Sequence, residues 1–165
     1  IMSLFAEEGI RALAQGLPKI VSSPGDIAAR SKCLYGAWLC GAVLGNVGMA
    51  LQHKLCHTLG GTYNLPHAET HTVVLPHALA YNAPAVPEAI DRIARALGVG
   101  DAARGMFDLA ASLGAPTALK DIGMPEGQLD WCAEIATQNA YANPRPIEKA
   151  AIRALLEDAY HGKRP

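Results

Sequence analysis

Histidines are concentrated in one short part of the chain. Five of the six lie between positions 53 and 77, and four of them form the pairs His53/His57 and His67/His71. Residues four apart lie on one face of a helix, one turn from each other. Neutral imidazoles bind zinc or ferrous iron, and an imidazole also transfers protons near neutral pH. The spacing therefore predicts a metal or acid–base site built on two helices.

The two histidine pairs are separated by a segment rich in turn residues. It contains Gly60-Gly61 and Leu65-Pro66, so two helices joined there would bring His53, His57 and His67 around one cavity. A single histidine is more often an ordinary core or surface residue. Four at helical spacing favour a functional site over that interpretation.

Length and charge limit the classes of protein to which the chain can belong. With 165 residues, half of them hydrophobic, the chain suffices for one domain with a sizeable core. The 14 basic and 15 acidic residues are nearly balanced and form no basic run, so we expect no nucleic-acid partner. Charged residues such as Arg30 and Lys32 interrupt each apolar stretch before the ~20 residues of a membrane span. We expect no membrane partner either.

The cysteines and the first residues bear on the cellular compartment. Cysteines stand at positions 33, 40, 56 and 132, in apolar helical stretches and without a C-x-x-C pair. Buried, reduced thiols are the simplest interpretation, and they fit the cytoplasm. The chain opens on Ile1 directly in a helical pattern, without the order of a signal peptide. We expect further residues before Ile1.

Apolar periodicity predicts an all-α, multi-helix fold with residues 1–165 as a single domain. Only Val73-Val74-Leu75 is a β-branched apolar run, and it is too short to indicate a strand. Gly/Pro breaks separate the predicted segments. The expected helices cover residues 4–16, 27–44, 47–61, 67–82, 87–97, 103–113, 127–139 and 146–160.

Local signals suggest where several of these helices end. We expect Gly16 with Pro18 to end the first helix, Ser23 to cap the second, and Pro76 to kink or end the fourth. The second helix is apolar nearly all round. Such a helix is usually buried, so we expect it to be central, with Trp38 in the core.

The stretch from residue 53 to residue 82, HKLCHTLGGTYNLPHAETHTVVLPHALAYN, resembles the signature of the iron-containing alcohol dehydrogenases. That pattern is H-x-x-x-H-x-x-G-x-x-x-x-x-P-H followed by L-P-x-x-x-x-x-N. The sequence motif P-H-A-E-T-H, together with the preceding motif L-C-H-T-L-G-G, resembles the maleylacetate reductase branch of the family. The matching positions are His53, His57, Gly60, Pro66, His67, Leu75, Pro76 and Asn82.

The resemblance implies the helical C-terminal domain of the dehydroquinate synthase-like fold. In that family the first and third histidines of the pattern are metal ligands, which points to His53 and His67 as ligands of Fe²⁺ or Zn²⁺ if a metal is bound. The middle histidine makes His57 the candidate catalytic acid or base. An aspartate and a histidine ligand, and a dinucleotide-binding α/β domain, are expected before Ile1.

The resemblance also implies a reaction: reduction of maleylacetate to 3-oxoadipate by NADH or NADPH, in the breakdown of aromatic compounds. The substrate is a small dicarboxylate, for which His71, His77 and Tyr63 are candidate binding residues. We expect a solvated surface position for Lys54, since it neighbours His53 but points elsewhere on the helix. Related enzymes are commonly homodimers, and we expect the same here.

Two other functions remain open at the level of sequence. A metal-dependent alcohol or glycerol dehydrogenase of the same family would use His53 and His67 to polarise a simple carbonyl. A non-catalytic helical metal-binding or interaction domain would use the histidines for structure, although closed zinc sites need four N or S ligands. The behaviour of a His57 variant separates these classes, because a catalytic histidine can be lost without unfolding the protein.

Overall fold

The structure, a computed structural model, describes residues 1–139 and 141–165. Their regular structure is entirely helical, and no strand occurs among them, which confirms the all-α prediction. Val73 and Val74 lie inside a helix. The elements are α1 (Met2–Ser22), α2 (Ile27–Leu44), α3 (Leu51–Tyr63), α4 (His67–Asn82), η1 (Ala83–Ala85), α5 (Pro87–Leu97), α6 (Ala102–Ser112), η2 (Leu119–Ile122), α7 (Leu129–Thr137) and α8 (Lys149–His161).

The junction of α1 and α2 differs from the prediction. α1 continues through Gly16 and Pro18 to Ser22, so neither residue ends it. A proline removes only one hydrogen bond of the ladder, and α1 is held by its packing along α2. The cap of α2 is Asp26 rather than Ser23: Asp26 Oδ1 accepts from the backbone nitrogen of Ala29 at 3.0 Å. Aspartate caps as strongly as serine.

The end of α3 lies beyond the glycine pair. α3 runs through Gly60 and Gly61 to Tyr63, whereas we expected the glycines to stop it. The stop is Asn64, whose φ of 52° and ψ of 37° place it in the left-handed region. Asparagine tolerates that conformation better than most residues. α3 also begins at Leu51 rather than at residue 47, so the helix that carries two histidines lies later in the chain than predicted.

α4 begins and ends where the sequence predicts. Pro66 precedes its first residue, His67, and the helix continues through Pro76 to Asn82. Pro76 therefore does not end the helix. Its ring is fully buried, and this burial offsets part of the cost of the missing hydrogen bond.

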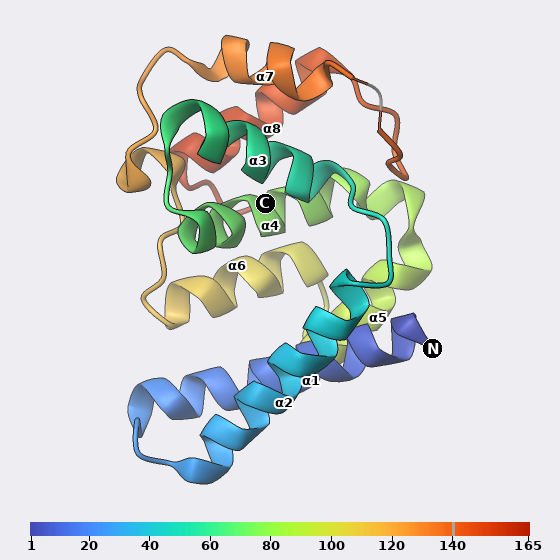
Figure 1. Ribbon diagram of the computed structural model, residues 1–165, viewed down its shortest axis with the longest axis vertical. Helices are drawn as coiled ribbons and strands as arrows, with labels where there is room; N and C mark the ends of the chain where they lie inside the picture. Colours follow the sequence, from blue (N-terminus) through green and yellow to red (C-terminus); the bar gives the residue numbers. More distant parts are fainter. Residues whose placement is uncertain (140) are drawn as a thin grey trace.

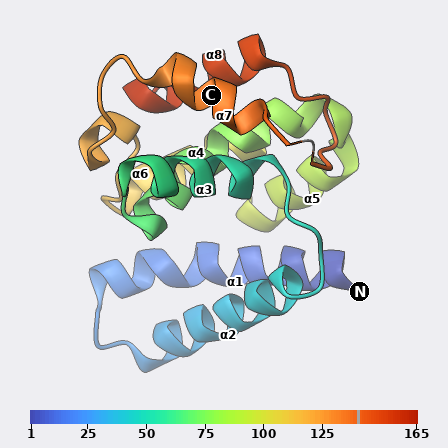
Figure 2. The ribbon, with the colours of Figure 1, turned by 45° about the horizontal axis from the view of Figure 1, so that its top comes forward.

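The helices form two unequal groups. α1 and α2 are an antiparallel pair that lies beneath the rest of the molecule, as Figure 1 and Figure 2 show. α5 connects the groups because it packs on both α1 and α6. α4 lies within the larger group and contacts α3, α6 and α8, while α7 packs on α8 and α3.

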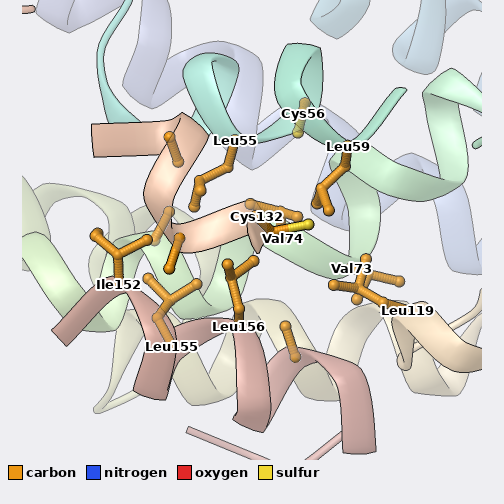
Figure 3. Close-up of a cluster of buried hydrophobic side chains, with 14 of the residues drawn as sticks. Leu55, Cys56, Leu59, Val73, Val74, Leu119, Cys132, Ile152, Leu155 and Leu156 are labelled. Carbon is orange, nitrogen blue, oxygen red and sulfur yellow. The ribbon is translucent and has the colours of Figure 1, made fainter. Parts of the chain in front are cut away.

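The main hydrophobic core lies among α3, α4, α7 and α8. Figure 3 shows its side chains converging on the space between these helices. Burying one aliphatic side chain contributes roughly 1.5–3 kcal/mol, so this cluster fixes how α3 sits against α4. The labelled core residues are Leu55, Cys56, Leu59, Val73, Val74, Leu119, Cys132, Ile152, Leu155 and Leu156.

The expectation that α2 is a central, buried helix is wrong. α1 is the main element that it contacts in the described chain, and only Ala29, Gly36 and Leu39 of α2 are buried. Trp38 is 63% exposed, and its ring lies 6.5 Å from that of Phe5. An apolar composition shows that a helix has apolar side chains. It does not show which of them are covered by other helices of the same chain.

The structure also bears on the expected buried, reduced cysteines and on the expected lack of a membrane-spanning segment. All four cysteines are free; Cys56 and Cys132 are buried, and Cys33 and Cys40 are partly buried. Burial raises the pKa of the Cys56 thiol to about 12, so this thiol is unreactive near neutral pH. In the part of the chain that the structure describes, none of the helices combines the length and hydropathy that a membrane span requires.

Candidate functional site

Four imidazole rings from α3 and α4 form a closed circuit. The ring centroids are 4.3 Å apart for His67 and His71, and 4.9 Å apart for His53 and His71. The distances are 5.9 Å for His53 and His57 and 6.5 Å for His57 and His67. Each ring thus has two neighbours. The structure brings together the three histidines expected around one site and adds His71 to them.

The local structure explains this convergence. His53 and His57 lie one turn apart on α3, as His67 and His71 do on α4. The short connection at Asn64 folds α4 back against α3. The core fixes the buried sides of both helices, so the histidines occupy their remaining adjacent sides.

Two of the four rings, those of His53 and His71, have lowered pKa values. Burial, together with the neighbouring imidazoles of His67, His53 and His57, lowers the pKa of His71 to about 4. Burial is also the main reason why the pKa of His53 is lowered, followed by His57 and His67. Both rings are therefore neutral at neutral pH, and each carries a proton on only one of its two nitrogens. His57 and His67 are exposed.

Gln52 contacts the cluster, although the sequence gave no reason to single it out. Its Nε2 lies 3.0 Å from His71 Nδ1, 3.5 Å from the His71 carbonyl oxygen and 3.4 Å from Cys56 Sγ. Gln52 is partly buried on α3. A signal was present in retrospect: Gln52 precedes His53 directly, at the start of the helix that carries the first histidine pair.

His77, a predicted substrate-binding residue, lies away from the circuit of four rings. It is buried, with 4% of its surface exposed, and its ring packs edge-on against Phe107 of α6 at 6.4 Å. Burial lowers its pKa, while Asp158 acts in the opposite direction. His77 and Asp158 line a cavity of about 390 Å³ together with Arg145.

Tyr63, also predicted to bind substrate, is turned towards the start of α7. Its hydroxyl donates to Gln128 Oε1 at 3.3 Å and accepts from Cys132 Sγ at 3.5 Å. Burial raises the pKa of this phenol. The hydroxyl is therefore engaged by neighbours in the core.

Lys54 is not the solvated surface residue that we expected. It is half-buried, and its ammonium lies 5.9 Å from the centre of the Tyr141 ring. Burial raises the pKa of Tyr141 to about 12, and the hydroxyl of this residue is buried without a hydrogen-bond partner among the described residues. Lys54 therefore packs towards the segment after α7, because its stem covers apolar surface.

The segment between α7 and α8 is tied to the starts and ends of the histidine helices. Asn143 Oδ1 accepts from the backbone nitrogen of Leu51 at 3.3 Å, at the beginning of α3. The side chains of Asn143 and Asn82 exchange two hydrogen bonds of 2.8 and 3.2 Å. Arg145 donates to the Tyr81 carbonyl at 3.1 Å, near the end of α4. Arg145 thus caps the C-terminal end of α4.

The donor set of the cluster is suited to part of a metal site. His53 and His67 are the expected ligands, and imidazole nitrogen is a good ligand for iron or zinc. Within residues 1–139 and 141–165, however, no group of three or more His, Cys, Asp or Glu side chains is placed to hold a metal ion. These two histidines would need further ligands from outside this chain.

Comparison with known proteins covers nearly the whole chain. The family described as "Fe-containing alcohol dehydrogenase family, C-terminal" matches residues 1–160. A maleylacetate reductase of Burkholderia cepacia is 59% identical over 165 residues, which make up 100% of this chain and 47% of that protein. The chain therefore spans about half the length of the curated relatives that it matches.

Solved structures agree with this relationship. A putative alcohol dehydrogenase from Ralstonia eutropha JMP134 has a TM-score of 0.98 and 68% identity, over 99% of this chain and 47% of the other. Maleylacetate reductase from Agrobacterium tumefaciens has a TM-score of 0.97 and 55% identity, over 100% of this chain and 47% of the other. The resemblance inferred from residues 53–82 is confirmed.

Proposed function

The chain belongs to the Fe-containing alcohol dehydrogenase family, as its C-terminal domain, and from this we propose that it is part of a maleylacetate reductase. The observation that carries the proposal is the circuit of four imidazoles in a chain similar throughout its length to reductases of that name. His71 completes the circuit, and it lies in the P-H-A-E-T-H stretch that resembles the reductase branch.

The proposed reaction is the reduction of the carbon–carbon double bond of maleylacetate to give 3-oxoadipate, a step in the breakdown of aromatic compounds. A hydride from NADH or NADPH adds to the carbon β to the ketone. The electron pair of the double bond moves onto the ketone oxygen, and a proton then adds to the α carbon. The protein must therefore stabilise an anionic oxygen and deliver one proton.

We assign proton delivery to His57. It is the exposed member of the first histidine pair, and a ring at the surface can take up a new proton after each turnover. His71 is the substrate-binding residue that the geometry favours, because it lies within the circuit of rings. For His77 and Tyr63 the assignment stays a prediction from sequence, since their nearest contacts lie on α6 and beside α7.

If the whole protein holds Fe²⁺ or Zn²⁺, His53 and His67 are the residues of this chain that we assign to it. The neutral state of His53 leaves a lone pair for coordination. Such an ion would supply Lewis-acid stabilisation of the substrate oxygen. Without it, the imidazole N–H groups of the cluster are available to stabilise the same anionic oxygen.

We place the nicotinamide cofactor mainly on the part of the whole protein that this chain does not include. The chain covers 47% of its relatives' length, and the remainder is sufficient for a dinucleotide-binding domain. We also propose a homodimer in the cytoplasm. The free thiols of Cys33 and Cys40 fit a reducing compartment.

A second candidate is a metal-dependent alcohol dehydrogenase. It is favoured by the 68% identity to the protein described as a putative alcohol dehydrogenase. The two functions differ in substrate and in their dependence on a metal, so one set of assays separates them.

The test is NADH consumption by the full-length protein that carries this chain, with maleylacetate and, in parallel, NAD⁺ reduction with short alcohols. Each assay is repeated after exhaustive chelation and after return of Fe²⁺ or Zn²⁺. Maleylacetate turnover that exceeds alcohol turnover supports the proposal. Metal-dependent alcohol oxidation without maleylacetate turnover would overturn it. Turnover lost on chelation and restored by one ion would support His53 and His67 as ligands.

A further inference from the structure

His71 has two ring nitrogens in very different surroundings. Nδ1 lies 3.0 Å from Gln52 Nε2. Nε2 is buried and, among the described residues, makes no hydrogen bond. Buried polar atoms without a partner are rare in proteins and cost about 1–3 kcal/mol each. An unpaired atom inside a cluster of chemically active side chains therefore points to a ligand that is not part of this chain.

The orientation of the Gln52 amide follows from its neighbours. The same amide group faces the His71 carbonyl oxygen at 3.5 Å, and that oxygen can only accept a hydrogen bond. Turning the amide over would set two acceptor oxygens against each other. The group that faces His71 is therefore the NH₂, which donates.

A donating amide fixes the tautomer of His71. Nδ1 must accept from Gln52 and so carries no proton, which places the ring proton on Nε2. The two nitrogens of an imidazole point in divergent directions, so this N–H is aimed away from Gln52. The rings of His53 and His67 flank His71, at 4.9 and 4.3 Å.

We propose that Gln52 is a positioning residue that holds His71 as a neutral Nε2–H donor, and that this donor binds a carboxylate oxygen of the substrate. The inference rests on the proposed function, which supplies a dicarboxylate. A neutral donor of fixed direction suits this task, because it selects an anionic oxygen without bringing a second charge into the cluster.

The ligand can reach the donor from the side of His67. That residue is exposed, stands at the first position of α4, and makes no hydrogen bond within the described residues. Its ring lies 4.3 Å from that of His71 and is the exposed neighbour that must turn aside for a ligand to reach Nε2. Gln52, in contrast, is held by contacts with both His71 and Cys56, so the tautomer is set before the ligand arrives.

The direct test is the tautomer of His71 in the full-length protein, measured by NMR with ¹⁵N-labelled histidine and assigned with a His71→Phe variant. We expect the proton on Nε2 in the wild type. Gln52→Glu presents a carboxylate that accepts from Nδ1–H, so it should move the proton to Nδ1. Gln52→Leu removes the amide and should leave a mixture. A wild-type protein with the proton on Nδ1 would overturn the inference, whichever substrate the enzyme uses.

Kinetics give the second readout. In Gln52→Glu the lone pair of His71 Nε2 would face the substrate carboxylate, so KM for maleylacetate should rise about tenfold or more. The kcat should change much less, because hydride transfer and the proton from His57 are untouched.

Gln138→Glu, the same change at an exposed position, is the matched control and should match the wild type. An altered tautomer with an unchanged KM would show that His71 does not bind the carboxylate. A wild type without maleylacetate turnover would instead reject the proposed function and leave the tautomer result standing.

Discussion

The four clustered histidines differ in exposure, and this separates what each can do. His53 and His71 are partly buried, with lowered pKa values, so we propose that they serve as neutral donors or ligands. His57 and His67 are exposed and can exchange protons with solvent. We therefore propose that one of the exposed pair delivers the proton, and the resemblance to the family favours His57.

Replacing His57 by Gln tests this division. The glutamine keeps a polar side chain but cannot deliver a proton at neutral pH, so kcat for maleylacetate should fall by about 10²–10⁴-fold. The melting temperature should stay close to that of the wild type, because His57 is exposed. Steady-state kinetics and thermal unfolding measure the two effects. His161→Gln, at an exposed histidine of α8, is the control. Unfolding of the His57 variant with loss of structure would favour a structural role for the cluster.

The buried position of His77 predicts that the free energy of unfolding depends on pH, because burial lowers the pKa of His77 below the usual 6.5. In the unfolded chain His77 takes up a proton below about pH 6.5, whereas in the folded protein it resists protonation. The stability contributed by neutral His77 is therefore complete above that pH and is lost as the pH falls towards the folded pKa. His77→Gln removes this dependence, by at most about 1.4 kcal/mol per pH unit.

Urea unfolding between about pH 5 and about pH 8 measures the effect. His53 and His71 also have lowered pKa values and contribute to the slope of the wild type. The difference between the wild-type and His77→Gln curves isolates His77. Two parallel curves would show that His77 is protonated as easily in the folded protein as in the unfolded one.

Spacing predicted the histidine cluster because a helix fixes which residues share a face. It could not predict Gln52, whose role depends on the distance between its amide and a ring on the next helix. The same limit applies to Tyr141, which reaches Lys54 from a segment far along the chain. Contacts between side chains that are distant in sequence depend on how whole helices pack. The type of a residue and its spacing in the sequence do not reveal that packing.

Among the helices, α1 and α2 owe their close approach to glycine. A Cβ atom at Gly36 would lie 2.9 Å from Leu13 Cγ and 3.0 Å from the Gly9 carbonyl oxygen. A Cβ atom at Gly16 would lie 2.5 Å from Cys33 Sγ. Helix backbones can pack this closely only where side chains are missing on the facing sides. This pairing is the main contact that holds α2 to the rest of the described chain.

Two glycines of α2 provide a matched test of that packing. Alanine at either position gains up to about 1 kcal/mol of helix propensity. At Gly41 nothing lies within 4 Å of the new Cβ atom, so Gly41→Ala should raise the free energy of unfolding. At Gly36 the new atom meets backbone, which cannot move away cheaply, so Gly36→Ala should lower it by about 1–3 kcal/mol. Thermal or urea unfolding compares the two. Equal stability of the variants would show that α1 and α2 are less closely packed than in the structure.

The helices themselves were largely predictable from periodicity and breaks. The ranges 27–44, 67–82 and 87–97 are those of α2, α4 and α5. The errors lie at ends where a single residue was given too much weight, such as Pro18 inside α1. Tertiary contacts decide whether a weak breaker ends a helix, and those contacts are not visible in a local pattern.

At the scale of the molecule, the site depends on segments that are far apart in sequence. The histidine helices rest on a core shared with α7 and α8, and the segment after α7 reaches back to the start of α3. The sequence predicted the order of the α-helices in the described chain but not which surfaces they cover. The outer side of α2 illustrates this, since Leu34 and Trp38 are exposed in spite of their hydropathy. Covered surface depends on the whole assembly of helices and is not set by the composition of one of them.

Asn143 is one of the side chains that join these distant segments, and its removal should weaken the whole unit. Asn143→Ala leaves the Leu51 nitrogen and both polar ends of Asn82 without their partners. Each lost partner costs about 1 kcal/mol, so the free energy of unfolding should fall by about 2–4 kcal/mol. Urea unfolding measures this, with Asn46→Ala as the exposed control.

A double-mutant cycle separates the amide pair from the cap of α3. If the Asn82–Asn143 exchange is a real coupling, the loss in the double variant Asn82→Ala/Asn143→Ala should be smaller than the sum of the single losses by about 1 kcal/mol. What remains of the Asn143→Ala effect then belongs to the Leu51 nitrogen at the start of the helix that carries His53 and His57. Two results together would contradict this. They are strictly additive losses of unfolding free energy in the cycle and an Asn143→Ala loss no larger than that of Asn46→Ala. In that case the core alone would hold α3 in place, and the segment after α7 would pack against α3 without fixing its position.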